Sequence, residues 1–281
     1  MAEVKNTSTA PRPAPKAVAG KPKNSNNMLL NFLVVLACIA VGQLIYYFVL
    51  GSPSNFLDAE KHSPKNIMGT MYLGGAIVPI LMATLLILIS FIIERGLTIF
   101  KAKGKMAAGE FVRKVQFHLA NGNVDAALAE CDKQSGSVGN VMRAGLLKYK
   151  EMSVNTHLDT DQKLLSITKE IEEATALELP MLEKNLVFLS TISSAATLLG
   201  LIGTVLGMIK SFQAMGQAGA PDASALANGI SEALINTALG ITTSFFAIIA
   251  YNFYTTIIDG ITFGIDESGF TLTQSFAANY K

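Results

Sequence analysis

The sequence predicts an all-α integral membrane protein with four transmembrane helices and long helices that extend into a cytoplasmic helical domain. Half of the 281 residues are apolar, only 15% are charged, and the mean hydropathy is +0.40. Four long stretches carry no charge, and the polar segment between the second and third has helical periodicity. Because a water-soluble domain of this size does not need so apolar a composition, a membrane protein is the first inference.

The uncharged stretches define the membrane crossings. They cover residues 24–57, 66–93, 185–209 and 233–258. Each exceeds the roughly 20 apolar residues that cross a hydrocarbon core of about 30 Å. In lipid the backbone must satisfy its own hydrogen bonds, so these stretches are expected to be helices. We therefore predict transmembrane helices at 28–50, 67–95, 185–210 and 229–258.

Basic residues indicate the orientation. Residues 1–27 carry five Lys or Arg against one Glu, and basic residues also follow the second span, whereas residues 211–228 contain neither Lys nor Arg. Cytoplasmic segments are enriched in Lys and Arg. The N-terminal tail, a helical domain at 96–184 and a C-terminal helix or tail at 259–281 are therefore predicted to be cytoplasmic. The loops at 51–66 and 211–228 are predicted to be periplasmic.

The first 50 residues raise the question of a cleaved signal peptide. The leader, residues 1–27, has the Pro-, Lys- and Asn-rich composition of a disordered tail. The apolar part, 28–50, is longer than a signal-peptide core, and the GSPSN that follows lacks a typical cleavage site. We expect a retained additional N-terminal transmembrane helix.

The middle segment predicts short paired helices. One apolar stripe comprises Phe111, Val115 and Leu119, and after a break at Asn121-Gly122-Asn123 the pattern resumes with Val124, Leu128 and Cys131.

From Asp161 a helical pattern runs into the third span, which predicts one long helix with a kink at Pro180. The C-terminal segment keeps a helical apolar pattern of Ile261, Ile265, Phe270, Leu272 and Phe276, which predicts that the fourth helix extends inward as an amphipathic helix.

Several chemistries are not expected. Cys38 and Cys131 have no CxxC partner and are interpreted as ordinary core cysteines. The three histidines are dispersed, so no metal site is predicted. GTVLGMIKS lacks the adjacent Gly-Lys of a phosphate-binding loop. Without a nucleophile–base pair either, we expect no enzyme, no cofactor and no nucleic-acid partner.

Small and hydroxyl-bearing residues form stripes on the third and fourth spans. In the third span, Gly200, Gly203 and Gly207 lie on a face that another backbone can approach closely, and Ser190, Thr197 and Thr204 recur at intervals of seven. The fourth span repeats the pattern with Thr237 and Gly240. The glycines are interpreted as a surface for close packing of subunits. Ordinary helix packing is the alternative explanation.

Glu232 lies at the start of the fourth span, on or beside its small-residue stripe. An ionisable residue in a membrane is costly, which favours a functional role. A carboxylate at a helix N-terminus is also favoured by the helix dipole, so an interfacial structural role is equally open.

Two long sequence elements are more specific evidence of function than the stripes. LVFLSTISSAATLLGLIGTVLGMIKSF (186–212) and LANGISEALINTALGITTSFFAIIAYN (226–252) resemble the MotA/TolQ/ExbB proton-channel family, most closely its ExbB branch. Weaker similarity begins near Ile67 and reaches the C-terminus. The resemblance implies a homopentameric ring in the bacterial inner membrane that converts proton-motive force into work.

The resemblance also implies partners. An ExbD-, TolR- or MotB-type subunit with a single transmembrane helix would pass through the pore and supply the protonatable aspartate. A TonB-type periplasm-spanning protein would receive the work and drive outer-membrane transport.

Carried onto this sequence, the resemblance places Thr204 and Thr237 beside the pore, with Thr197 on the same stripe and Glu232 at the pore mouth. The sequence departs from the family at Thr197 and Phe246, where prolines are usual, and in its additional N-terminal span. The expected bends are therefore in doubt.

Alternative functions remain open at this point. A TolQ-like role in envelope integrity and a gliding or flagellar stator role are the nearest competitors, and sodium is an alternative ion. From another class, the chain could be a non-conducting membrane scaffold whose small-residue faces only pack helices.

Overall fold

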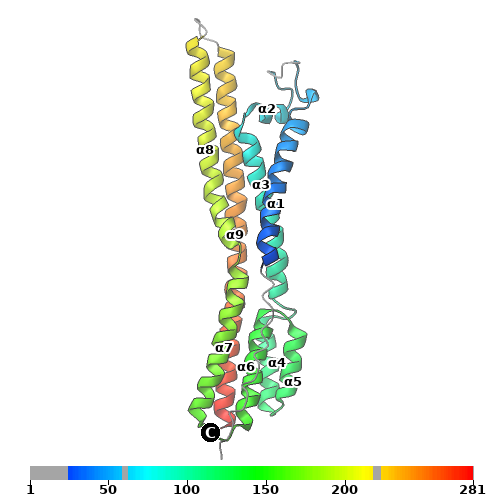
Figure 1. Cartoon of the computed structure of the whole chain (residues 1–281), viewed down its shortest axis with the longest axis vertical. Helices are drawn as coiled ribbons and strands as arrows, with labels where there is room; N and C mark the ends of the chain where they lie inside the picture. The colour runs from blue at the N-terminus through cyan, green and yellow to red at the C-terminus, as the bar shows by residue number, and fades with distance from the viewer. Residues whose placement is uncertain (1–24, 59–62, 218–222, 281) are drawn as a thin grey trace, which may run out of the picture.

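The computed structural model describes residues 25–58, 63–217 and 223–280. It is 87% helical, and the described residues contain no strand, which confirms the all-α prediction. Four helices are long and apolar enough to cross a membrane, so the chain is a multi-pass membrane protein. Figure 1 shows an elongated molecule in which long helices run beside shorter ones, with a compact helical bundle at one end.

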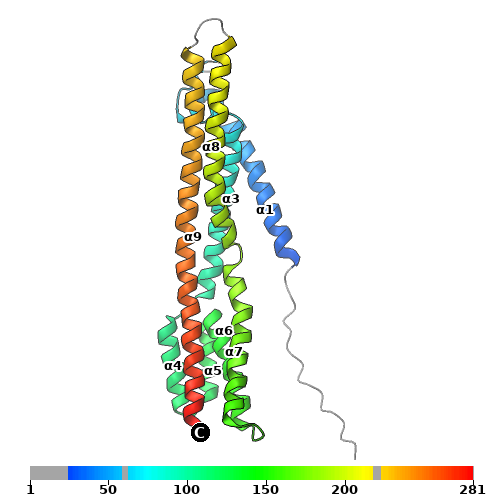
Figure 2. The same cartoon turned by 90° about the vertical axis from the view of Figure 1, so that its left-hand side faces the viewer.

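The additional N-terminal span is α1 (Ser25–Leu44), extended by a π-helical turn, η1 (Ile45–Leu50). It packs against α3 (Ile77–Ala102) through Gly42, where a Cβ atom would lie 3.1 Å from the backbone nitrogen of Ala83. From this close approach α1 diverges from α3 toward its own N-terminus (Figure 2).

The described part of the connection between α1 and α3 is structured. It contains the short helices η2 (Pro53–Asn55) and α2 (Ile67–Leu73), and the buried Asn55 amide donates to the carbonyls of Val49 and Leu50. The prediction of a single helix at 67–95 was wrong, because the chain turns at Gly74-Gly75 before α3 begins. Gly75 has φ +75°, a left-handed conformation that glycine adopts without steric cost.

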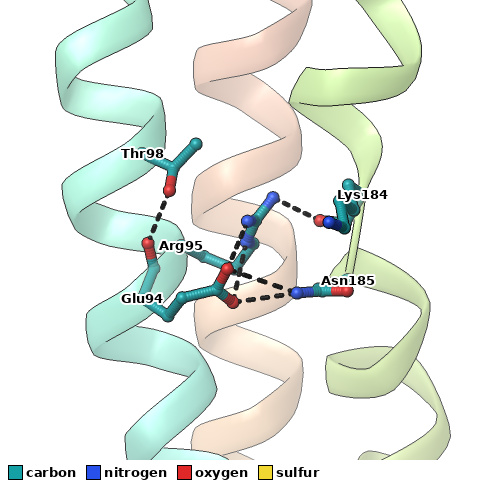
Figure 3. Close-up of polar contacts among 5 residues, drawn as sticks. All are labelled: Glu94, Arg95, Thr98, Lys184 and Asn185. Carbon is teal, nitrogen blue, oxygen red and sulfur yellow. Dashed lines mark hydrogen bonds and ion pairs between the residues drawn. The ribbon is translucent and has the colours of Figure 1, made fainter. Parts of the chain in front are cut away.

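The predicted continuous helix with a kink at Pro180 was also wrong. α7 (Thr160–Glu183) includes Pro180, and the break with α8 (Leu186–Gln217) comes at Lys184 and Asn185. Asn185 has φ 64°, which asparagine tolerates better than most residues. Its side chain donates to Glu94 of α3 at 3.0 Å (Figure 3), so a tertiary contact fixes the position of the break.

The lower bundle comprises α4 (Ala108–Ala120), α5 (Val124–Gln134) and α6 (Ser137–Val154), packed against α7 and the end of α9. Gly122 takes φ 67° between α4 and α5, where the sequence predicts a break. Phe111, Val115 and Leu119 are all buried, as their spacing predicts. Burial of these apolar side chains stabilises the bundle.

The last helix, α9 (Ala223–Asn279), runs from one end of the molecule to the other (Figure 1). Its final turns are part of the bundle core, where the Phe276 ring packs edge-to-face against Tyr149 with centroids 4.9 Å apart. Ile261, Ile265 and Leu272 are buried in the same way, but Phe270 is 68% exposed and lies outside the predicted apolar face.

Cys131 gives a first testable prediction. It is buried in the bundle, and burial, together with the neighbouring Asp132 carboxylate, raises the pKa of its thiol to about 12. Because the thiolate is the reactive form, maleimide labelling of Cys131 in a Cys38→Ala background should be at least about a hundredfold slower at pH 8 than labelling of the unfolded chain. Mass spectrometry measures the rate. The control variant carries Thr156→Cys together with Cys38→Ala and Cys131→Ala, and residue 156 is exposed. Equal rates for the two cysteines would contradict the burial of Cys131.

Candidate functional site

The α8–α9 pair contains all the candidate pore and helix-packing residues predicted from the sequence. Its helices approach at backbone-to-backbone distance because glycine leaves no side chain between them. A Cβ atom on Gly200 would lie 3.0 Å from the Asn236 carbonyl, one on Gly207 would lie 3.0 Å from the Ala233 nitrogen, and one on Gly240 would lie 2.6 Å from the Ala196 carbonyl. The glycine surface is therefore occupied by the neighbouring helix of the same chain, and not by another subunit.

Gly203 makes room for a side chain. The side chain of Asn236 passes over it, and a Cβ atom on Gly203 would overlap the Asn236 side chain. Asn236 is 1% exposed, and its amide nitrogen donates to the Gly74 carbonyl at 2.9 Å. This bond ties α9 to the turn before α3. Sequence reasoning placed Asn236 beside the small-residue stripe of the fourth span but predicted no role for it.

The three threonines are all half-buried, but their hydroxyls have different surroundings. Thr204 lies on an outward groove of α8 beside Val205 and Met208, and its hydroxyl donates to the Leu201 carbonyl at 2.6 Å. Thr237 is half-buried between the helices, and its hydroxyl lies 3.4 Å from the Gly200 carbonyl.

Thr197 is also half-buried, with its hydroxyl 3.4 Å from the Ser193 carbonyl. In each case the hydroxyl hydrogen is directed to a backbone carbonyl, which leaves the oxygen lone pairs able to accept another hydrogen bond.

Glu232 forms an ion pair across the helix pair. Its carboxylate lies 2.8 Å from the Lys210 ammonium, and it rests against Gly75, where any Cβ atom would displace it. The Glu232 side chain is only 15% exposed, whereas that of Lys210 is 58% exposed. The pairing with Glu232 was missed because the two residues are brought together only by the fold.

The outward faces of the pair are apolar. Large exposed residues line α8 and α9 on the sides away from their mutual contact: Leu198, Leu201, Val205, Ile209, Ile241, Phe245, Ile249 and Phe253. Among the described residues, no group of three or more His, Cys, Asp or Glu could hold a metal ion. In the part of the pair between residues 186 and 258 that the structure describes, threonine hydroxyls and the Glu232–Lys210 ion pair lie among apolar side chains. This arrangement suits hydrogen bonding with an acid from outside the chain.

Thr197 and Phe246 replace the prolines expected from the resemblance. Both α8 and α9 continue as helices through these positions. The backbone therefore keeps the hydrogen bonds that a proline would remove.

Known proteins are similar to this chain over the region that contains the α8–α9 pair. Residues 134–267 match the model of the MotA/TolQ/ExbB proton channel family. They include all of α8 and most of α9. The match begins at the end of α5 and therefore also covers α6 and α7.

Relatives include a Tol-Pal system protein and biopolymer transport proteins. The Tol-Pal system protein TolQ of Pseudomonas aeruginosa is 34% identical over 121 residues, 43% of this chain and 52% of the relative. The biopolymer transport protein ExbB of Pseudomonas putida is 29% identical over 166 residues, 58% of this chain and 50% of the relative. ExbB of Xanthomonas campestris is 28% identical over 115 residues, covering 41% and 46%. The chain thus spans about half the length of these relatives.

Proposed function

We propose that this chain, which belongs to the MotA/TolQ/ExbB proton channel family, is the ion-conducting subunit of a proton-driven membrane motor. The match to that family covers residues 134–267. The observation that carries the proposal is the α8–α9 pair, whose threonine hydroxyls interrupt apolar faces. Threonine can donate to a carboxylate or accept from a neutral acid, so it can contact either protonation state of an aspartate.

The protonatable acid would come from a partner. Between Leu186 and Ile209, and between Ala233 and Ile258, the chain has no Asp or Glu. We propose that an ExbD- or TolR-type subunit with a single transmembrane helix supplies an aspartate between Thr204 and Thr237, with Thr197 on the same pathway and Glu232 at its mouth. The exposed apolar residues of α8 and α9 would then be covered by neighbouring copies in a homopentameric ring.

The proposed topology places the α4–α6 bundle and both termini in the cytoplasm of a bacterial inner-membrane protein. The basic residues of the tail and of the segment after α3 support this orientation. The periplasmic segments would be 51–66 and 211–228. The second was predicted to be a loop, but α8 continues to Gln217 and α9 begins at Ala223, so most of it is helical.

We propose that the work drives TonB-dependent outer-membrane transport. The ExbB relatives support this role. A TolQ-like role in envelope integrity is a second candidate, since the TolQ relative matches over a similar share of the chain.

Proton flux tests the pore assignment. In liposomes that hold this chain with its single-span partner, Thr204→Val or Thr237→Val should lower proton-driven flux at least about tenfold, because a hydrogen bond to a charged group is worth roughly 1.5–3 kcal/mol. A pH-sensitive dye inside the liposomes measures the flux.

Thr84→Val is the matched control. Thr84 belongs to α3 and not to the pair, and its hydroxyl also donates to a backbone carbonyl, that of Ile80. Full flux in both α8 and α9 variants would sink the pore assignment. An unmodified complex that moves no protons would instead favour a scaffold.

A further inference from the structure

A cavity of about 680 Å³ lies between α1, α3 and α8, close to the α7–α8 break. Its volume falls within the roughly 300–1,000 Å³ of pockets that hold small ligands. The α1 residues that line it fall within residues 31–35 of that helix. Figure 2 shows α1 diverging from the other helices toward its N-terminus. The additional N-terminal helix thus forms one wall, and the family region forms another.

Most of the lining is apolar. Val35 of α1, Ile87 of α3 and Ile192 of α8 contribute aliphatic surface. Phe91 and Phe188 complete it as a stacked pair, with ring centroids 5.0 Å apart and planes 6° apart. Such walls favour a hydrocarbon chain over water.

The remaining lining is polar and positively charged. Asn31, Lys184 and Asn185 line the cavity, and Lys184 forms no ion pair with any residue in the described ranges. The nearby Glu94 carboxylate is already paired with Arg95 at 2.6 Å. The local charge of these groups is therefore one positive unit, carried by the exposed Lys184.

The position of Lys184 is fixed by its backbone. The buried Arg95 guanidinium donates to the Lys184 carbonyl, and the Asn185 amide donates to Glu94 (Figure 3). These bonds hold the break between α7 and α8 against α3. The charged residue and the apolar walls are therefore arranged before any ligand binds.

We propose that this cavity binds an anionic phospholipid, with one acyl chain between α1, α3 and α8 and the phosphate at Lys184. Basic pockets between transmembrane helices bind anionic head groups, and the unpaired lysine beside an apolar cavity has that character. Bilayer lipid is the amphiphile present where α1 and α3 cross the membrane. The site is distinct from the α8–α9 threonines, so its occupancy does not depend on ion conduction.

Tryptophan quenching tests the proposal, since the natural chain contains no tryptophan. The full chain with Phe188→Trp is reconstituted in vesicles of phosphatidylcholine and phosphatidylglycerol, in which one or the other lipid is brominated at the same minor mole fraction. Brominated phosphatidylglycerol should quench the fluorescence about fivefold more effectively, as one basic side chain at an anionic surface allows. Val35→Trp, on the opposite wall, serves if the substitution at the stacked ring disturbs folding.

Two further variants identify the head-group contact. Adding Lys184→Gln should make the two brominated lipids quench equally, whereas Lys169→Gln, at an exposed site on α7, should leave the preference unchanged. Phe48→Trp, 75% exposed on η1, reports bulk lipid and should show no preference. Two results would overturn the proposal. With Lys184 intact, the two brominated lipids could quench equally at both residue 188 and residue 35, or neither lipid could quench at either residue because protein fills the cavity.

Discussion

Replacing Gly240 with alanine is expected to destabilise the protein by about 2 kcal/mol, because the added methyl group has no space to occupy. Its Cβ atom would lie 2.6 Å from the Ala196 carbonyl and 2.9 Å from the Gly200 Cα atom. Both neighbours are backbone, so α8 and α9 must separate. Thermal unfolding in detergent, followed by circular dichroism, should show a midpoint lowered by several degrees.

Gly260→Ala is the matched control on the same helix. A Cβ atom there meets nothing within 4 Å, so the substitution should keep or raise the midpoint, because alanine favours helix over glycine by about 1 kcal/mol. The prediction therefore has opposite signs at two glycines of α9. A Gly240 variant as stable as the Gly260 variant would contradict the close packing of the helices.

Replacing Arg95 with methionine is expected to cost about 2–4 kcal/mol and to loosen the α7–α8 break. Arg95 is 3% exposed, and its loss leaves the Lys184 carbonyl without the guanidinium donor and the Glu94 carboxylate with only the Asn185 amide. The Glu94 side chain is 41% exposed, so the expected cost lies below the roughly 3–5 kcal/mol of breaking a fully buried pair. Lys184 is a trypsin site, so limited proteolysis followed by mass spectrometry should show faster cleavage after this residue.

Arg143→Met provides the comparison. Arg143 also pairs with a carboxylate, that of Asp132 at 3.1 Å, but its side chain is 50% exposed. Exposed pairs contribute at most about 1 kcal/mol, so this variant should remain close to the unmodified protein in stability and in cleavage after Lys184. Equal effects of the two substitutions would show that Arg95 does not hold the break.

Regular periodicity made much of the fold predictable. The uncharged stretches located the membrane helices, and the spacing of Phe111, Val115 and Leu119 identified residues that are buried. The turn at Gly75 and the break at Asn185 were not predicted. Each depends on a backbone conformation that is permitted by one residue and fixed by contacts with distant helices, which a local pattern does not contain.

The candidate site was predictable as a set of residues but not as an arrangement. The two elements that resemble the family indicated α8 and α9, and the glycines marked where a backbone comes close. The Lys210–Glu232 pair and the Asn236–Gly74 bond join residues from different elements. Arg95 was counted only among the basic residues that flank a span, because nothing in its local sequence distinguishes a buried arginine from an exposed one.

The unbroken length of α9 has a mechanical consequence. At about 1.5 Å per residue, its 57 residues form a rod of roughly 85 Å that includes both the Thr237 region and the bundle core around Phe276. The neighbouring rod is divided at Asn185, beside Arg95. A tilt or rotation of α9 in the membrane is therefore carried directly to the bundle, whereas α8 can change its angle relative to α7 at a single joint.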